Sequence, residues 1–182
     1  IMEASAIATK QLMITDDWKS CVNDVLDCLG RATDASRVYM FENHTDSNGA
    51  IMTSQRYEWT ADGIAPQIDN PDLQNANWKD FGLDRIESIL SQGHPIFGHV
   101  REFLPQERTI FESQGIVSIL LVPVFVKNEW WGFIGFDACS RERNWSEVER
   151  DVLTTVAGIL GETIRRKRGE KALRLSEERW QF

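Results

Sequence analysis

Cysteine is the residue type in this sequence best suited to covalent chemistry. The chain has three cysteines, Cys21, Cys28 and Cys139, and none belongs to a CxxC pair. Cys21 and Cys28 are seven residues apart, which predicts one helix face but two turns of separation, too far for a disulfide. Cys139 follows the apolar segment GFIGFDA, where partial exposure would make a thiol reactive. The alternative is that Cys139 is a small residue at a strand end, facing solvent.

Histidines are the candidate metal ligands, since imidazole is the commonest axial ligand of haem iron. The chain has His44, His94 and His99. His99 follows the short strand segment IFG and is the best candidate for a pocket position. His94 precedes Pro95 in a predicted turn, and His44 begins a polar turn. The alternative for each histidine is a surface or hydrogen-bonding role.

Aromatic residues are the third group that could line a binding site. Tyr57 and Trp59 end a predicted strand, whereas Trp78 and Phe81 lie in a long polar, irregular segment at 62–84. A connection this long inside a compact domain is usually functional or disordered. Small-molecule sites are mostly apolar with a few polar groups, which this setting would suit. Core packing is the competing explanation for most of the seven tryptophans.

Composition excludes several classes of function. The net charge of −8 argues against a nucleic-acid-binding surface, which needs basic residues. No apolar run approaches the roughly 20 residues of a membrane helix, so we expect no membrane insertion. Phosphate-binding, nucleophile-elbow and zinc motifs are missing from the sequence, so we expect no catalysis by this chain. The unpaired cysteines and the lack of a visible signal peptide favour a cytoplasmic location.

The first third of the chain predicts a helix followed by a hairpin. Apolar residues recur at helical spacing over Thr9–Ala32. The segment at 36–43, SRVYMFEN, is rich in branched and aromatic residues and predicts a strand. The turn HTDSNG then leads into AIMTSQRYEWT at 50–60, which predicts the second strand of a hairpin.

The remaining elements follow from the same patterns. We expect short helices before QGHP and over LPQERTIFESQG, with a short strand at IFGHV between them. IVSILLVPVFV predicts a buried strand in which Pro123 marks a bulge or an unpaired position. WWGFIGFDA returns as its partner, and Trp130 and Trp131 must face opposite sides of the sheet. Ser146 and Glu149 form a capping box that opens the last helix. This order predicts an α+β domain with helices against an antiparallel sheet.

Several of these blocks together resemble the GAF domains of multi-sensor (GAF/PAS) signal-transduction histidine kinases. The blocks are SRVYMFEN, TSQRYEW, IDNP and SILLVPVFVKNEWWGFIGFDACSRERNWSEVE, in that order. The resemblance implies a central six-stranded antiparallel sheet with terminal helices packed on one face and a ligand pocket on the other. It also implies a sensory role in a two-component system. Family ligands include cyclic nucleotides, haem, linear tetrapyrroles and small metabolites, so fold membership alone leaves the ligand unknown.

The resemblance also selects the candidate site residues. In some GAF domains a cysteine holds a tetrapyrrole or a haem, which makes Cys139 a candidate, although the neighbouring histidine typical of bilin attachment is missing. The segment at 62–84 falls where a pocket lid would lie. The candidate ligand-binding residues are therefore Tyr57, Trp59, Trp78, Phe81, His99 and Cys139. No metal-binding or catalytic residue is predicted.

Three functions remain open at this point. The first is a small-molecule sensor that relays the state of its pocket through the terminal helices, as a homodimer, to a histidine kinase. The second is a haem-binding redox or gas sensor with Cys139 or a histidine at the iron. The third is a ligand-free dimerisation module. Charges at Ile159 and Leu160 are expected to abolish the dimer.

The expected domain division has three parts. Residues 1–15 form a linker and the start of a helix, 16–164 form the GAF domain, and 165–182 form a helical linker. The tail EKALRLSEERWQF is similar to the beginning of a PAS domain, so adjacent PAS and kinase modules are the expected partners.

Overall fold

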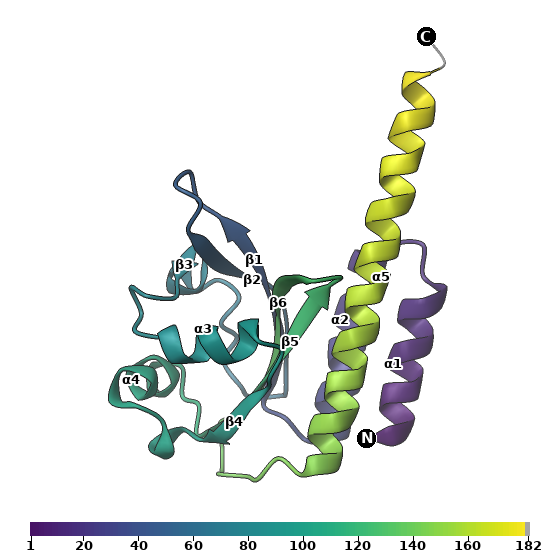
Figure 1. The fold of residues 1–182 in the computed structure, drawn as a ribbon. Coiled ribbons are helices and arrows are strands. Elements are labelled where there is room, and N and C mark those ends of the chain that lie inside the picture. Colours follow the sequence, from purple (N-terminus) through teal and green to yellow (C-terminus); the bar gives the residue numbers. More distant parts are fainter. Residues whose placement is uncertain (181–182) are drawn as a thin grey trace.

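The computed structural model describes residues 1–180 and consists of one sheet between two helical layers (Figure 1). Helices α1, α2 and α5 cover one face, and the shorter α3 and α4 lie over the other. The helices are α1 (Met2–Ile14), α2 (Trp18–Thr33), α3 (Asp84–Ser91), α4 (Pro105–Ser113) and α5 (Glu147–Arg179), with 3₁₀ turns at Pro71–Leu73 and Val100–Glu102. The strands are β1 (Arg37–Thr45), β2 (Ile51–Thr60), β3 (Ala76–Asn77), β4 (Ile96–His99), β5 (Ser118–Val126) and β6 (Glu129–Ala138).

The six strands form one antiparallel sheet in the order β3-β2-β1-β6-β5-β4. This confirms the predicted fold class and both predicted hairpins. β1 pairs with β6, so that Arg37 lies opposite Asp137 although 100 residues separate them. The irregularity expected at Pro123 lies between Val124 and Phe125, where the β5–β6 register shifts. The two centre strands thus come from opposite ends of the domain.

Alternation along the strands divides the core into two clusters on opposite faces of the sheet. In β6, Trp131 packs with the helices α1, α2 and α5, and Trp130 packs on the other side. This confirms that the two tryptophans point to opposite faces. Trp131 makes an edge contact with Trp18 of α2, whereas Trp130 contacts Trp78 at a centroid distance of 5.4 Å.

The single helix predicted over Thr9–Ala32 is wrong. Two helices replace it, because the chain is extended at Thr15, where ψ is 140°. The Asp17 carboxylate accepts a hydrogen bond from the Lys19 amide and caps the start of α2. Buried apolar residues continue from α1 into α2, so helical spacing alone does not reveal the break.

The last helix begins at the predicted capping box. Ser146 Oγ accepts from the Glu149 amide, and the Glu149 carboxylate accepts from the Ser146 amide, which confirms the prediction. At Gly161, a Cβ atom would lie 2.0 Å from the Phe125 carbonyl oxygen, so α5 approaches β5 backbone to backbone. Beyond the body of the domain α5 continues as a projecting helix (Figure 1). Phe182, the end of the PAS-like tail, lies outside the described residues.

None of the helices in residues 1–180 is both long and apolar enough to cross a membrane.

Candidate functional site

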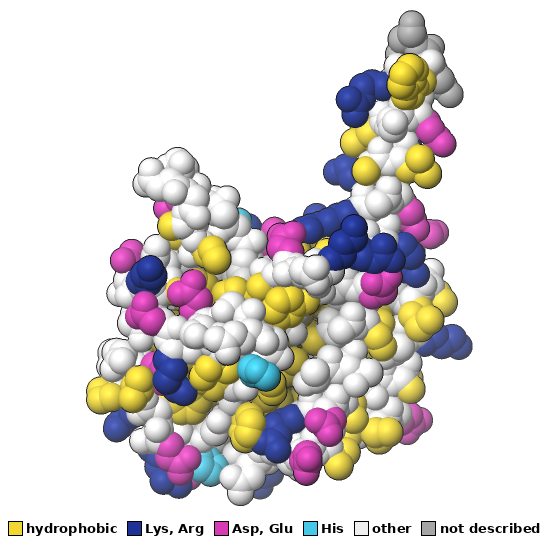
Figure 2. Space-filling model, in the orientation of Figure 1, with side chains coloured by type: hydrophobic (Ala, Val, Ile, Leu, Met, Phe, Trp, Pro, Cys, Tyr) yellow, Lys and Arg dark blue, Asp and Glu magenta, His cyan; other side chains and the backbone are white. Residues whose placement is uncertain are grey.

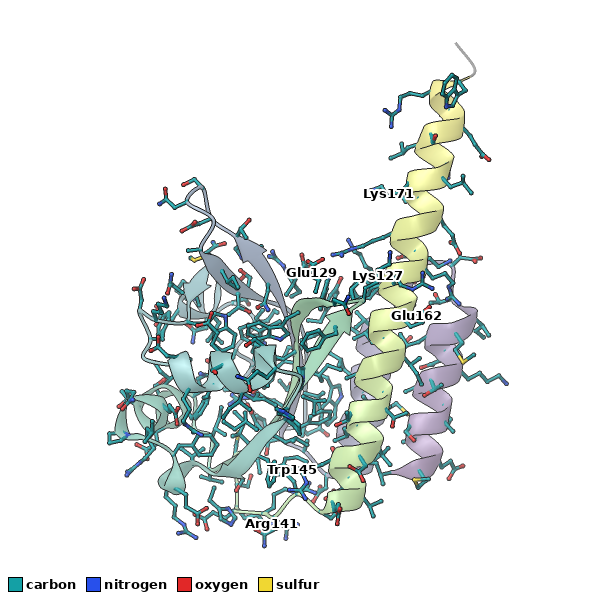
Figure 3. The ribbon with its side chains drawn as sticks, in the orientation of Figure 1. Lys127, Glu129, Arg141, Trp145, Glu162 and Lys171 are labelled. Carbon is teal, nitrogen blue, oxygen red and sulfur yellow. The ribbon has the colours of Figure 1, made fainter. Side chains whose placement is uncertain are left out.

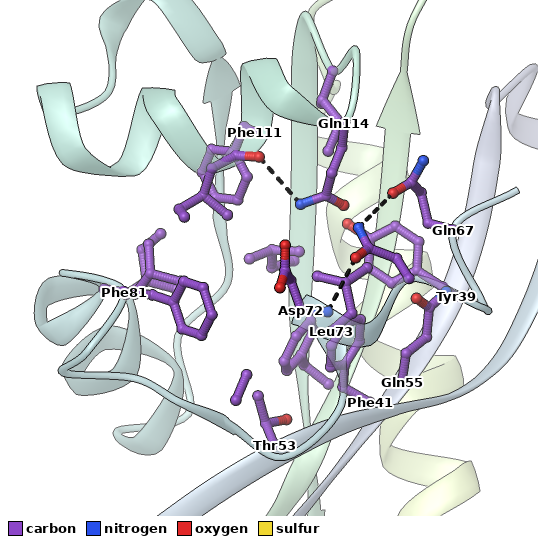
Figure 4. Close-up of a pocket in the computed structure, with 18 of the residues that line it drawn as sticks. Tyr39, Phe41, Thr53, Gln55, Gln67, Asp72, Leu73, Phe81, Phe111 and Gln114 are labelled. Carbon is purple, nitrogen blue, oxygen red and sulfur yellow. Dashed lines mark hydrogen bonds between the residues drawn. The ribbon is translucent and has the colours of Figure 1, made fainter. Parts of the chain in front are cut away.

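A cavity of about 120 Å³ lies on the face of the sheet opposite the long helices. Its floor is formed by β1, β2, β5 and β6, and its cover by the segment before α3 together with α3 and α4 (Figure 4). Six aromatic side chains contribute to the wall, namely Tyr39, Phe41, Trp78, Phe81, Phe111 and Phe133. This is the face on which the resemblance placed a ligand pocket.

A buried ion pair lies at the floor of the cavity. Arg37 Nε donates to Asp137 Oδ2 at 3.0 Å, and Tyr39 Oη donates to Asp137 Oδ1 at 2.7 Å. The remaining guanidinium nitrogens donate to the carbonyls of Ala65 and Gln114 at 3.1 and 2.7 Å. Arg37 therefore connects the sheet to the start of the covering segment, at Ala65, and to the residue after α4, Gln114. Its positive charge is neutralised by the Asp137 carboxylate.

Burial dominates the protonation of this cluster. Loss of solvent raises the pKa of Asp137 to about 6, against the opposing effects of Arg37 and the Tyr39 hydroxyl. Burial, with the nearby Asp137 charge, also raises the pKa of Tyr39 well above its usual value. At neutral pH the cluster therefore consists of an ionised carboxylate, a guanidinium and a neutral phenol.

Three buried polar side chains in the wall have no hydrogen-bond partner for one of their atoms within residues 1–180. These atoms are Thr53 Oγ1, Gln55 Oε1 and Trp78 Nε1, on side chains that are 5, 3 and 4 % exposed. Gln55 Nε2 donates to Glu58 Oε2 at 2.7 Å, which fixes the other amide atom as an oxygen. Unsatisfied buried polar groups are costly, so these atoms mark the part of the cavity that calls for a polar partner.

Two sets of polar contacts hold the cover in place. Arg85 of α3 binds the fully buried Glu107 of α4 through two hydrogen bonds of 2.9 and 2.6 Å, and Glu107 also accepts from the Leu104 amide. Over β2, the Glu58 carboxylate accepts from the Gln67 amide at 2.8 Å. Both ends of the cover are thus fixed by carboxylates.

Trp78 and Phe81 are the predicted site residues that line the cavity. Tyr57 and Trp59 do not, and their prediction as pocket residues is wrong. A register shift in the β1–β2 ladder leaves Arg56 as an extra residue, which reverses the alternation beyond Gln55. The two side chains therefore pack on the helical side of the sheet.

His99 and Cys139 also lie away from the cavity wall, contrary to the prediction. His99 Nδ1 is hydrogen-bonded to the Ser118 hydroxyl at 2.9 Å, at the sheet edge. Cys139 is half-buried, its amide donates to Ser36 Oγ, and burial raises the pKa of its thiol, partly offset by Arg37. A raised pKa lowers the thiolate fraction of Cys139 at neutral pH.

Comparison with known proteins identifies the fold of this cavity-bearing sheet. The GAF domain family model matches residues 17–164. The chain belongs to the GAF domain family. GAF domains are sensory domains, which gives the cavity its functional context.

A curated relative places such a domain in a signalling protein. The methanogenesis regulatory histidine kinase FilI of Methanothrix harundinacea is 45% identical over 168 residues. The match covers 92% of this chain but 19% of FilI, so the chain spans about a fifth of that relative. The circadian input-output histidine kinase CikA of Synechococcus elongatus is 28% identical over 60 residues, 33% of this chain and 8% of CikA.

Solved structures share the GAF fold at low sequence identity. The phycocyanobilin-bound GAF domain of a cyanobacterial phytochrome has a TM-score of 0.76 at 14% identity, covering 93% of this chain and 96% of that one. A far-red-absorbing GAF structure with bound biliverdin has a TM-score of 0.74 at 17% identity, covering 91% of this chain and 99% of that one. At these identities the likeness concerns the fold.

The residues of this GAF domain do not fit a tetrapyrrole. The cavity volume of about 120 Å³ falls below the roughly 300–1,000 Å³ of pockets for drug-sized ligands, and a tetrapyrrole is larger still. No histidine or cysteine is among the described residues that line it, so neither axial ligation nor thioether attachment has a donor there. In the described chain, no three His, Cys, Asp or Glu side chains form a group able to hold a metal ion.

The floor residues Arg37, Tyr39 and Asp137 were missed from the sequence. One signal was available, because Asp137 is a charged residue within the apolar run WWGFIGFDA, where a carboxylate needs a buried partner. The identity of that partner depends on the pairing of β1 with β6, which is a long-range contact.

Proposed function

We propose that this chain is the ligand-sensing GAF domain of a histidine-kinase-type signalling protein, and that the occupant of its cavity biases the position of α5. The observation that supports this most directly is the position of β6. Phe133 and Asp137 line the cavity, while Ile134 and Phe136 of the same strand pack against the helical layer. A shift of β6 on ligand binding would therefore move side chains in the cavity and side chains that pack against the helices.

The first residues of β6 offer a short physical connection. Trp78 of the cavity wall contacts Trp130, and the neighbouring Glu129 lies 3.6 Å from Arg168 of α5. Figure 3 shows Lys127 of the β5–β6 turn and Glu129 at the start of β6 beside this helix. Output requires that the ligand prefer one of two arrangements of these contacts, since equal binding to both would shift nothing.

The proposed partner in signalling is a second copy of this chain, paired through the terminal helices. Leu173 on the projecting part of α5 and Trp180 just after its end are 63 and 87 % exposed. With Ile159 they repeat at multiples of seven residues, and Arg166 takes the intervening position. Seven-residue spacing of apolar side chains is typical of paired helices. Figure 2 shows hydrophobic side chains on this projection and basic side chains where it leaves the body. PAS and kinase modules attached to such a helix would be the receivers, with this chain located in the cytoplasm.

The dimer is tested with Leu173→Glu, which should convert a dimeric mass into a monomeric one in light scattering. Ala172→Glu is the matched control, because it adds the same charge on a neighbouring helix face. Leu160 is unsuitable for this test, since it is buried in the domain core and a charge there would unfold the protein. An unchanged mass for Leu173→Glu contradicts the dimer.

The sensing function is tested by native mass spectrometry of freshly purified protein, followed by hydrogen exchange with and without the retained molecule. We expect a small molecule to be retained and the amides of α5 to change their exchange. A ligand at a hundredfold its Kd should stabilise the domain by about 2.7 kcal/mol. If no molecule is retained and no metabolite raises the Tm, the chain is a ligand-free module.

A further inference from the structure

We propose that the cavity binds a small organic cation that also carries one hydroxyl or carbonyl oxygen, a ligand of the amino-alcohol class. This inference rests on the proposed sensing function and adds the chemistry of the ligand. Three properties of the cavity carry it, namely its size, its charge and the unpartnered atoms in its wall.

Size limits the ligand first. A volume of about 120 Å³ is below the roughly 300–1,000 Å³ of sites that hold drug-sized ligands. A compact metabolite of fewer than about ten non-hydrogen atoms would fit, whereas a nucleotide would not.

Charge selects a cation over an anion. The charged side chains that line the cavity are Arg37, Asp137 and Asp72 (Figure 4). Arg37 is held by Asp137, so its charge is compensated. Asp72 is exposed to solvent at the rim of the cavity and forms no ion pair within the described chain, and the Glu58 carboxylate behind Gln55 adds a second negative charge. An anion would therefore meet unpaired carboxylates and no free cation.

The aromatic wall favours the same choice. The faces of Trp, Tyr and Phe attract cations, above all when the site is shielded from water. Phe81 of the cover lies across the cavity from the floor residues Tyr39 and Phe41 in Figure 4. Phe133 also contributes to the wall and is stacked on Phe41 at a centroid distance of 4.8 Å. A methylated ammonium group would lose little hydration on contact with this aromatic wall and would keep its charge.

The unpartnered atoms require an oxygen on the ligand. Trp78 Nε1 can only donate, so it needs an acceptor, and Gln55 Oε1 can only accept, so it needs a donor. A hydroxyl group supplies both, and the Thr53 hydroxyl can take either role. A ligand carbonyl oxygen would accept from Trp78 Nε1, and an ammonium N–H of the ligand would then donate to Gln55 Oε1.

Choline is the probe for this class, and 3,3-dimethyl-1-butanol is its uncharged counterpart of the same shape. Titration calorimetry and saturation-transfer NMR should show choline binding at least about tenfold more tightly than the alcohol, the effect of about 1.4 kcal/mol of charge recognition. Propionate, a small anion, should not bind. Equal affinity for choline and the alcohol, or tighter binding of propionate, would overturn the inference.

Two variants locate the recognition. Asp72→Asn should remove most of the preference for choline over the alcohol. Asp69→Asn should keep it, because Asp69 is exposed like Asp72 but does not line the cavity. Trp78→Phe keeps an aromatic ring but removes the donor, and should weaken choline and the alcohol by the same factor.

Failure of this inference differs from failure of the sensing function. If a retained metabolite of another class binds while choline does not, the ligand class is wrong and sensing stands. If neither a probe nor a metabolite binds, the unpartnered atoms bind ordered water only. Both the sensing function and the proposed ligand class are then wrong.

Discussion

Arg37 and Asp137 form an ion pair at the floor of the cavity, with Nε and Oδ2 3.0 Å apart and both side chains almost fully buried. The pair joins β1, the first strand of the domain, to β6, the strand that precedes α5. It also fixes Tyr39 on one side and the carbonyls of Ala65 and Gln114 on the other. The pair therefore links the floor of the cavity to both of its covering segments.

Removing one member of this pair should destabilise the domain strongly. Asp137→Ala removes the acceptor of both Arg37 and Tyr39 and leaves their buried donors without partners, which costs about 3–5 kcal/mol of unfolding free energy. Arg37→Met should cost a similar amount, and the double variant should cost less than the sum of the two. Urea denaturation measures all three.

An exposed ion pair provides the control. Arg174 and Glu178 are joined at 3.1 Å on the projecting part of α5, where both side chains are solvated. Arg174→Met should leave the unfolding midpoint essentially unchanged. Strict additivity of the two buried substitutions would contradict an energetic link between Arg37 and Asp137.

The pair should also give stability a specific pH dependence. Because burial raises the pKa of Asp137 to about 6, the folded protein takes up a proton at a pH where the unfolded chain, with its ordinary pKa near 3.8, does not. The contribution of this titration is complete below about pH 4 and is lost as pH rises through about 6. Relative to Asp137→Asn, the wild-type domain should therefore gain unfolding free energy between pH 7 and pH 5. A difference that is flat, or that shrinks over this range, contradicts the raised pKa.

Gly135 is the position that lets Tyr39 reach Asp137. A Cβ at Gly135 would lie 2.0 Å from Tyr39 Cε2, so Gly135→Ala should displace the ring and cost about 1–3 kcal/mol. Tyr39→Phe keeps the ring but removes the hydrogen bond, and should raise the pKa of Asp137 further. Thermal unfolding and an Asp137 titration by NMR measure both effects. Full stability of Gly135→Ala would mean that the ring approaches from another direction.

The capping box of α5 should contribute measurably to the stability of the domain. Ser146→Ala removes the hydroxyl that accepts from the Glu149 amide and should cost about 0.5–2 kcal/mol. Ser146→Asp should retain most of the cap. Ser140→Ala, an exposed loop serine upstream, serves as the control and should have no effect. A loss of similar size in both alanine variants would argue against a role for the cap.

Haem should not bind to this domain. Protein purified from cells supplied with a haem precursor should show a featureless visible spectrum, because no cysteine or histidine among the described residues faces the cavity. A Soret band that disappears in Cys139→Ala would contradict this expectation directly. A band retained in that variant but lost in His99→Ala would place the iron at the sheet edge.

The elements of the fold could be predicted locally because they depend on local rules. Ser146 and Glu149 identify the start of α5 by their spacing, and Trp130 and Trp131 must face opposite sides because a strand has a period of two. Helical spacing did not predict the break at Thr15–Asp17, because the apolar spacing continues from α1 into α2. The break depends on the extended Thr15 and on the Asp17 cap.

The sequence alone thus determined the class of the fold and the order of its elements, apart from the break between α1 and α2 and the short strand β3. The resemblance to the GAF family placed the pocket cover with Trp78 and Phe81. The tertiary structure decided which residues meet in the cavity. One extra residue in β2 turned Tyr57 and Trp59 away from the pocket and left Gln55 facing it, and this follows from cross-strand register. The pairing of Arg37 with Asp137 likewise requires two strands distant in sequence to lie side by side, because a buried charge is tolerated only where the fold supplies its partner.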